Sequence, residues 1–383
     1  MKNNPFVSIL IPYYNDGAFL KESVQSVLDS TYTDFELILL DHASTDEETV
    51  KIAHSFDDVR IKHIRMEKNL GAGSGLLLLE FLKHARGKYI KLFCADDIMV
   101  PDGLETLVGF MEENPDKDFA FGNMDYIDEN GNQLHENWFH ERHEFNINNN
   151  EFDELALFAN GVGHLPFPAC ICKRECFDHI QIEKVFIMIY DMTLWVRFLL
   201  NGYKIAFLNK SVVNYRIHSD QISSACHIQK AEHISGFESI EYCRIFYGIK
   251  TIPLLQKVFP TKYSLALKKG EENFIPFVIA HHYATSSVIP YQIFGRIELY
   301  KMLNDDKCRK KIENKFDFGI KEFREIYSYF LENTDSYFIR VQNKKAKKLA
   351  FLQIFYILLY KLTHWPIIKK IKNKKQQKTK YTI

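Results

Sequence analysis

The chain has 383 residues, of which 46% are hydrophobic and 14% are aromatic. This length and composition exclude a disordered protein and are typical of one large domain with an appended part. The formal charge sums to zero, and no nucleic-acid partner is expected.

The seven cysteines are scattered and odd in number, which favours a reducing, cytoplasmic compartment over a disulfide-bonded secreted protein. Cys170, Cys172 and Cys176 lack the spacing of a zinc site and are expected to be structural thiols. Residues 1–5 lead directly into a strand-like run, so no signal peptide is expected.

The first hundred residues alternate between short apolar runs and amphipathic segments. Strands are predicted at residues 7–12, 35–40, 60–66 and 89–93. Helices are predicted between them, from about residues 19 to 28, 46 to 56 and 75 to 85. This alternation predicts an α/β fold, a mostly parallel sheet flanked by helices on both faces, with ligands beyond the carboxyl ends of the strands.

The pattern changes after residue 118. A hairpin with its turn at residues 128–131 is followed by a strand at 169–173, a helix at 191–200, and two closing strands at 204–208 and 212–217. Helical patterns dominate from about residue 229. The predicted organisation is an α/β domain, a mainly helical region and a basic amphipathic tail, at residues 1–225, 226–340 and 341–383.

Two adjacent carboxylates, Asp96 and Asp97, end the fourth strand, and Pro101 follows them. Like charges this close raise each other's pKa unless a cation lies between them and a ligand. Their hard oxygen atoms suit Mn²⁺ or Mg²⁺ bridging the protein to a pyrophosphate. The alternative is a pair of acids that caps the next helix.

These pieces, in this order, resemble the family-2 glycosyltransferases of the GT-A fold, in the nucleotide-diphospho-sugar transferase superfamily. The resemblance covers residues 5–224. It rests on several ordered motifs: VSILIPYYND, FELILLDHASTD, the Asn69-Leu70-Gly71 turn, CADD with Pro101, YDMTLWVRFLLNGY and YRIHSDQIS.

The resemblance implies a nucleotide-sugar site at the ends of the first strands. Asp41 corresponds to the acid that pairs with the nucleotide base, which would lie against Pro12, Tyr13 and Tyr14. Asn69 is expected to line the same site. A solvated turn acid is the alternative for Asp41.

The resemblance also implies a metal site and a catalytic base. Asp97 is expected to bind the metal, with Asp96 directed to the ribose or the metal, and His218 as a third metal ligand or a pyrophosphate contact. Asp191 corresponds to the acid that removes the acceptor hydroxyl proton. The alternative for Asp191 is an ordinary helix N-cap, and the alternative for His218 is a structural role. Arg216, two residues before His218, could form a surface ion pair.

The chain departs from the family pattern in three motifs. His42-Ala43 stands where the family has Asp-Gly, Cys94 stands where an acid is common, and Leu76-Leu77 replaces Arg-Asn. These replacements remove polar contacts to the donor.

The function expected from the resemblance is inverting, metal-dependent transfer of a sugar from a nucleotide-diphosphate donor, a UDP-sugar by preference, to a saccharide or lipid-linked acceptor in surface-polysaccharide assembly. A second hypothesis is an inactive nucleotide- or sugar-binding protein with the same fold, prompted by the three departures. A third is a nucleotidyltransferase that uses the same metal.

The last 43 residues form a distinct basic segment. Residues 341–383 contain 12 lysines and no acidic residue, which leaves the rest of the chain with a net charge of −12. Their apolar centre, residues 349–360, is shorter than the roughly 20 residues that span a bilayer. Peripheral binding to the cytoplasmic membrane face is expected, with a helix packed on the body as the alternative.

Overall fold

The computed structural model describes residues 5–71, 75–135, 148–161, 163, 165–219, 221 and 228–326. The predicted basic tail lies outside these residues. The chain divides into two compact units, Met1–Asp305 and Asp306–Ile383. The first unit contains both the sheet and the helices that follow it, so the domain boundary expected near residue 225 stays a prediction.

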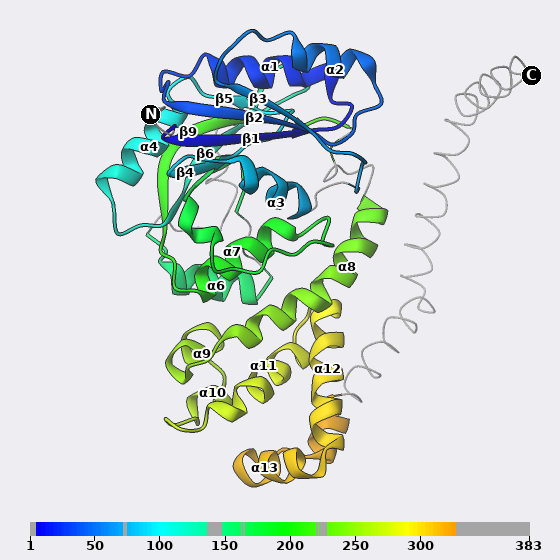
Figure 1. The fold of residues 1–383 in the computed structure, drawn as a ribbon. Helices are drawn as coiled ribbons and strands as arrows, with labels where there is room; N and C mark the ends of the chain where they lie inside the picture. Colours follow the sequence, from blue (N-terminus) through cyan, green and yellow to red (C-terminus); the bar gives the residue numbers. More distant parts are fainter. Residues whose placement is uncertain are drawn as a thin grey trace, which may run out of the picture. The chain divides into compact units, whose positions relative to one another are not determined.

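A nine-stranded sheet forms the centre of the first unit (Figure 1). Its main path runs in the order β3-β2-β1-β4-β8-β6-β9-β5, and β7 pairs with β6. The strands are β1 (Val7–Tyr13), β2 (Phe35–Asp41), β3 (Ile61–Arg65), β4 (Tyr89–Leu92), β5 (Ile98–Met99), β6 (Phe119–Ile127), β7 (Gln133–His135), β8 (Cys170–Lys173) and β9 (Ile205–Arg216).

The first four strands of this order pair in parallel, as the alternation of strands and helices predicts. β8 runs antiparallel to both β4 and β6, so the sheet is mixed beyond β4. The predicted α/β fold, with helices on both faces of the sheet and a helical C-terminal region, is confirmed. The prediction of two closing strands was wrong, because β9 is one continuous strand whose register against β6 shifts near Asn123.

Helices cover both faces of the sheet (Figure 1). α1 and α2 lie on one side, and α3, α6 and α7 lie on the other. The helices of this part are α1 (Gly17–Leu28), α2 (Glu47–His54), α3 (Gly75–His84), α4 (Gly103–Glu113), α6 (Glu151–Ala159) and α7 (Tyr190–Leu200), with 3₁₀ turns η1 (Phe167–Ala169) and η2 (Arg174–Phe177).

Trp195 fixes α7 to the sheet. Its ring is fully buried, stacks on Phe119 at 6.2 Å and meets Phe121 edge-on at 5.1 Å between centroids. The indole Nε1 donates to the carbonyl oxygen of Leu165 at 3.1 Å. Trp195 therefore has the packing role that the apolar face of this helix predicts, and it sets where the start of α7 lies.

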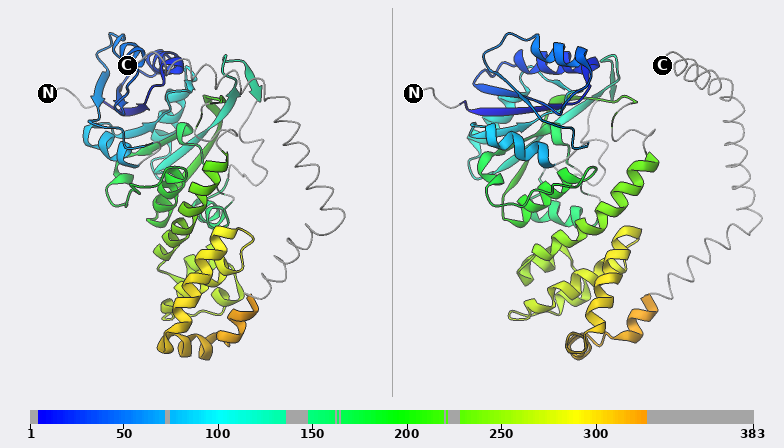
Figure 2. Two further views of the ribbon diagram at one scale, coloured as in Figure 1. Left: turned by 90° about the vertical axis from the view of Figure 1, so that its right-hand side faces the viewer. Right: turned by 45° about the vertical axis from the view of Figure 1, so that its right-hand side comes forward.

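Further helices continue the first unit beyond α6 and α7 (Figure 2). α8 contacts α7 and α12, and α9 contacts α6, so this helical region packs on the catalytic part of the same unit. The elements are α8 (Ile228–Ile245), η4 (Phe246–Gly248), α9 (Ile252–Val258), α10 (Lys262–Leu265), η5 (Glu272–Phe274), α11 (Ile275–Ala284) and α12 (Ile289–Asn304).

The described part of the second unit is short. It contains α13 (Asp306–Phe316), whose Ile312 is buried, followed by residues up to 326. Among the helices of the described residues, none has the length and apolar character needed to cross a bilayer.

Candidate active site

Asp41, at the carboxyl end of β2, is buried and engaged through both carboxylate oxygens. Oδ1 accepts the backbone N–H of Ser44 at 2.7 Å, and Oδ2 pairs with the Arg65 guanidinium. Arg65, which ends β3, also donates to the carbonyl oxygen of Ser44 at 2.8 Å. Asp41 is therefore not a solvated turn acid. Arg65 was missed, although its place at a strand end in the predicted sheet was available as a signal.

The loops after β1 and β2 are joined by Asn15. Its Oδ1 accepts the backbone N–H groups of Thr45 and Asp46 at 2.9 and 3.0 Å, and its own N–H donates to Ser44 Oγ at 3.1 Å. Asn15 and Ala43 both have positive φ, 56° and 60°. Ala43, which stands where the family pattern has glycine, thus has a left-handed backbone that costs an alanine about 1–2 kcal/mol.

His42 replaces a second acid and ties β2 to the turn that contains Asn69. Burial lowers the pKa of His42, so its ring is neutral, and Nε2 accepts the backbone N–H of Leu70 at 2.7 Å. The Asn69 side chain accepts the N–H of Gly71 at 2.7 Å and closes the turn. The departure at His42 therefore connects the turn to the strand.

The predicted wall for the base has one buried and one exposed tyrosine. Tyr13 pairs with Asp41 across the β1–β2 ladder, and burial raises the pKa of its phenol. Pro12 lies beside it on β1 and is half-buried. Tyr14 is 39% exposed and meets the His42 ring edge-on, with centroids 6.4 Å apart. The structure thus places the exposed Tyr14 ring against the buried His42 ring.

Asp97 is fully buried, and its two carboxylate oxygens differ in their hydrogen bonding. Oδ1 accepts the backbone N–H of Arg216 at 2.9 Å, whereas Oδ2 has no partner at hydrogen-bond distance in the part of the chain that the structure describes. The neighbouring Cys94 thiol is near enough to the carboxyl group to lower the pKa of Asp97 slightly, against the larger effect of burial. Burial first, and then the charge of Asp96, raise the pKa of Asp97 well above its usual range. An unpartnered buried oxygen of this kind fits a bound cation better than a helix cap.

Arg216 is buried, with 1% of its side chain exposed, so the surface ion-pair reading was wrong. Its Nε donates to the carbonyl oxygen of Asp96 at 2.8 Å, and its guanidinium pairs with Glu22 at 2.6 Å and lies over the Phe19 ring. Arg216 therefore fixes the backbone of the acid pair. The sequence motif around Arg216 did not predict that this side chain is buried.

Lys91 is a buried cation beneath the acids that the sequence reading missed. Its Nζ donates to the carbonyl oxygens of Leu92, at 3.1 Å, and Pro168. Burial lowers the pKa of Lys91 to about 8, against smaller opposing effects from Cys170, Cys94 and Asp97. At pH 7 the group therefore keeps its charge and partly compensates Asp97. The signal was a lysine inside an otherwise apolar strand.

His218 adjoins the acid pair. Its Nε2 lies 3.0 Å from Asp96 Oδ2, and its ring centroid lies 4.7 Å from that of Phe19. Burial raises the pKa of Asp16, Asp96 raises it further and His218 lowers it, so the end of the β1 loop lies within electrostatic range of both groups. The loop after β1 is thus hydrogen-bonded to the loop after β2 through Asn15, and Asp96 after β4 contacts His218 after β9. Asp16 lies within electrostatic range of Asp96 and His218.

A metal ion fits the side chains at this place. Ligand atoms of Cys94, Asp96 and Asp97 all lie within 4.8 Å of one another, and no other such group of three occurs among the described residues. Burial raises the pKa of the Cys94 thiol well above its ordinary value, so the thiol is protonated. The available ligand atoms are therefore the carboxylate oxygens of Asp96 and Asp97, which suit Mg²⁺ or Mn²⁺ better than a soft metal.

Asp191 lies in the first turn of α7, one residue inside the helix. The N-cap is Ile189, so the N-cap reading of Asp191 was wrong. Burial raises the pKa of Asp191 to about 6, although its carboxylate accepts the N–H of Met192 at 2.8 Å. The start of a helix normally lowers the pKa of a carboxyl group, but here desolvation has the larger effect and raises it. A pKa of about 6 suits a general base near neutral pH.

Tyr190 lies within electrostatic range of both Asp191 and Cys94. Burial raises the pKa of its phenol, and the charges of Asp191 and then Cys94 add to that effect, which places both groups near the ring. The sequence also suggests His164, Pro166 and Phe167, which precede the strand at residues 169–173, as the edge of the acceptor pocket, and the Phe167 ring lies 5.7 Å from the Tyr190 ring between centroids. His164, expected to edge the same pocket, lies outside the described residues.

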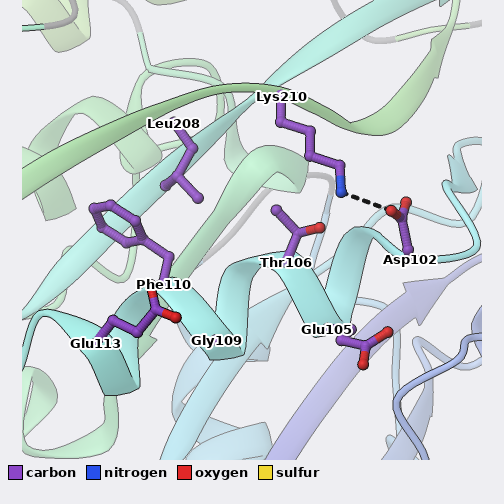
Figure 3. A pocket seen from close by; sticks show the side chains of 8 residues that line it. All are labelled: Asp102, Glu105, Thr106, Gly109, Phe110, Glu113, Leu208 and Lys210. Atoms are coloured by element: carbon purple, nitrogen blue, oxygen red, sulfur yellow. Dashed lines mark hydrogen bonds and ion pairs between the residues drawn. The ribbon is translucent and has the colours of Figure 1, made fainter.

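A groove of about 370 Å³ lies elsewhere, between α4 and β9 (Figure 3). Figure 3 shows Lys210 paired with Asp102 across it, at 2.6 Å. None of the predicted site residues lines this groove, so it is separate from the candidate active site.

Comparison with known proteins identifies the family. The family model described as glycosyl transferase family 2 matches residues 8–181. The uncharacterized glycosyltransferase MJ1057 of Methanocaldococcus jannaschii is 32% identical over 219 residues, which are 56% of this chain and 72% of that protein. The chain belongs to glycosyltransferase family 2.

Two further similarities bear on this family-2 glycosyltransferase. The putative teichuronic acid biosynthesis glycosyltransferase TuaG of Bacillus subtilis is 28% identical over 222 residues, 57% of this chain and 82% of TuaG. The crystal structure of S. aureus TarS 1–349 in complex with UDP-GlcNAc covers 81% of this chain and 91% of that chain, with a TM-score of 0.54 and 17% identity. The TarS similarity shows the GT-A fold.

Proposed function

We propose that this family-2 glycosyltransferase is an inverting, metal-dependent enzyme that moves a sugar from a UDP-sugar to a saccharide or lipid-linked acceptor in surface-polysaccharide assembly. The observation that carries the proposal is the buried, unpartnered Oδ2 of Asp97 beside Asp96. The complex of TarS with UDP-GlcNAc supports a UDP-sugar donor, and the name of TuaG supports a polysaccharide product.

The nucleotide would bind along the loops after β1 and β2. Asp41 would accept a base N–H, Tyr14 and Pro12 would bound the base, and Asn69 would line the donor site from the neighbouring turn. Asp41 is already held by Ser44 and Arg65, so its carboxylate is oriented before the donor arrives. Binding then loses little conformational entropy in these side chains.

Asp96 and Asp97 would hold the divalent cation, with His218 beside Asp96. When bound, the ion supplies positive charge against the departing diphosphate. Arg216 keeps the acid backbone in place, and the buried Lys91 partly offsets the charge of Asp97.

Asp191 would act as the base of a single displacement. The acceptor hydroxyl oxygen forms a bond to the anomeric carbon while the bond from that carbon to the diphosphate oxygen breaks, and the configuration inverts. The hydroxyl proton passes to Asp191, and UDP leaves with the electron pair of the broken bond. A carboxylate whose pKa is about 6 is deprotonated at pH 7 and basic enough to accept this proton.

A panel of nucleotide sugars incubated with Mn²⁺ tests the proposal. Release of UDP from a UDP-sugar supports it. Nucleotide binding without turnover across donors and acceptors favours the inactive binding protein, for which the protonated thiol of Cys94 in place of an acid is the specific argument. Release of pyrophosphate from a nucleoside triphosphate indicates a nucleotidyltransferase.

A further inference from the structure

Helix α7 begins without a cap from its own sequence. Its N-cap, Ile189, has no side-chain acceptor, and Ile187 and Met188 before it are also apolar. Ile187, Met188 and Ile189 precede the first helical residue, Tyr190, so their backbone N–H groups have no partner within the helix and need acceptors elsewhere. The three residues that lead to Asp191 must therefore be held from elsewhere in the chain.

Glu238 of α8 supplies those acceptors. One carboxylate oxygen accepts the N–H of Ile187 at 2.5 Å, and the other accepts those of Met188 at 2.9 Å and Ile189 at 3.1 Å. Glu238 is 2% exposed, so these bonds form away from water. Hydrogen bonds to an ionised acceptor are about twice as strong as neutral ones, and here three converge on one carboxylate.

The position of α8 is itself fixed beside this carboxylate. Tyr242 lies one turn after Glu238 on the same face of the helix, is fully buried, and donates to the carbonyl oxygen of Phe158 in α6 at 3.1 Å. α8 also contacts α7. Glu238 therefore projects from an anchored helix of the C-terminal region into the catalytic part of the same unit.

The segment that Glu238 holds is also fixed at its other end. Glu183 pairs with Arg197 of α7. Gly75, which starts α3, lies so close to the Glu183 carbonyl oxygen that an added Cβ would be 2.2 Å from it. Residues 183–189 thus run from the α3 start to the α7 start, and Glu238 determines how the second of these ends is oriented.

We infer that Glu238 is a positioning residue for sugar transfer: through the N–H groups of Ile187, Met188 and Ile189 it sets the orientation of Asp191. This inference rests on the proposed role of Asp191. The negative charge of Glu238 also raises the pKa of Asp191, as a smaller effect than burial. The C-terminal helical region therefore contributes directly to the geometry of the reaction.

Glu238→Gln tests the inference with little change in volume. The amide keeps one accepting oxygen but directs an NH₂ group at the remaining backbone donors, so the three bonds cannot all form. Glu298→Gln is the matched control, because Glu298 is a nearly buried glutamate of α12 whose partners, Arg244 and Lys301, lie in the helical region. Glu238→Ala, which removes all three bonds, is a second variant.

Two readouts separate positioning from stability. In UDP release from UDP-GlcNAc with Mn²⁺, we expect kcat to fall about tenfold or more in Glu238→Gln, because a misplaced catalytic group is costly, while KM for the donor changes less than about twofold. Hydrogen exchange of the 187–189 amides should accelerate in both Glu238 variants. Glu298→Gln should keep wild-type kcat and wild-type exchange at 187–189.

Each outcome decides a different point. Wild-type kcat in Glu238→Gln, or an equal loss in Glu298→Gln, overturns the inference, as does unchanged exchange at residues 187–189 in Glu238→Ala. A wild-type protein that turns over no nucleotide sugar refutes the proposed function instead, and the exchange readout then still decides whether Glu238 holds the loop.

Discussion

At the residue scale, the environment of Asp191 matters more than its place in the helix. A carboxylate in a first helical turn is stabilised by the helix dipole, yet burial here raises its pKa to about 6. We expect Asp191→Asn to lower turnover by about 10²–10⁴-fold, the usual contribution of a general base, with unchanged UDP affinity. UDP release and calorimetric titration measure the two quantities, and near-wild-type turnover would remove Asp191 from the mechanism.

The same pKa predicts the acid limb of the pH profile. Because the pKa of Asp191 is raised, its carboxylate is protonated and inactive as a base below about pH 6, and it is active above that value. kcat should therefore fall about tenfold per pH unit below about 6 and level off above it. A limb centred near pH 4, the range of an unperturbed aspartate, would contradict this environment.

At the element scale, the start of α3 packs closely on residues 183–189. The substitution Gly75→Ala, which adds one methyl group at this contact, tests how close the packing is. A Cβ at Gly75 would lie 2.2 Å from the Glu183 carbonyl oxygen and 2.7 Å from Ile182. Gly75→Ala should therefore lower the free energy of unfolding by about 1–3 kcal/mol, measured by denaturant titration.

Gly109→Ala in the interior of α4 is the control for that substitution. A Cβ at Gly109 meets nothing within 4 Å. It should raise the free energy of unfolding by about 0.5–1 kcal/mol, because alanine loses less entropy in a helix. Equal effects of the two substitutions would show that the α3 contact is looser than described.

The strands near the start of the chain could be predicted because their apolar runs and turn residues are local signals. The continuity of β9 could not, since the polar Asn209 and Lys210 interrupt its apolar pattern, and β6 pairs with β9 on both sides of them, at Phe207 and at Ser211. Arg216 and Glu238 were likewise hidden, because their partners lie far away in sequence. The motifs indicated the candidate acids, of which the structure places Asp96 and Asp97 side by side, but they did not predict how burial shifts the pKa values of Asp97 and Asp191.

At the scale of the whole molecule, the basic tail predicts where the enzyme works. Residues 341–383 carry 12 lysines and no acid. We expect the full chain to sediment with anionic vesicles at low salt and to be released as salt rises, and a chain ending at Arg340 to stay in solution. Neutral vesicles are the control. Equal sedimentation of both chains would assign membrane binding, if any, to another part.

The central claim concerns the cation that Asp96 and Asp97 would hold against a diphosphate. Calorimetric titration of UDP into the wild type, with Mn²⁺ and then with EDTA, tests it most directly. The claim predicts that Mn²⁺ tightens UDP binding by about tenfold or more, about 1.4 kcal/mol, and that folded Asp97→Asn loses this gain. UDP affinity that is the same with Mn²⁺ and with EDTA in the wild type would contradict it.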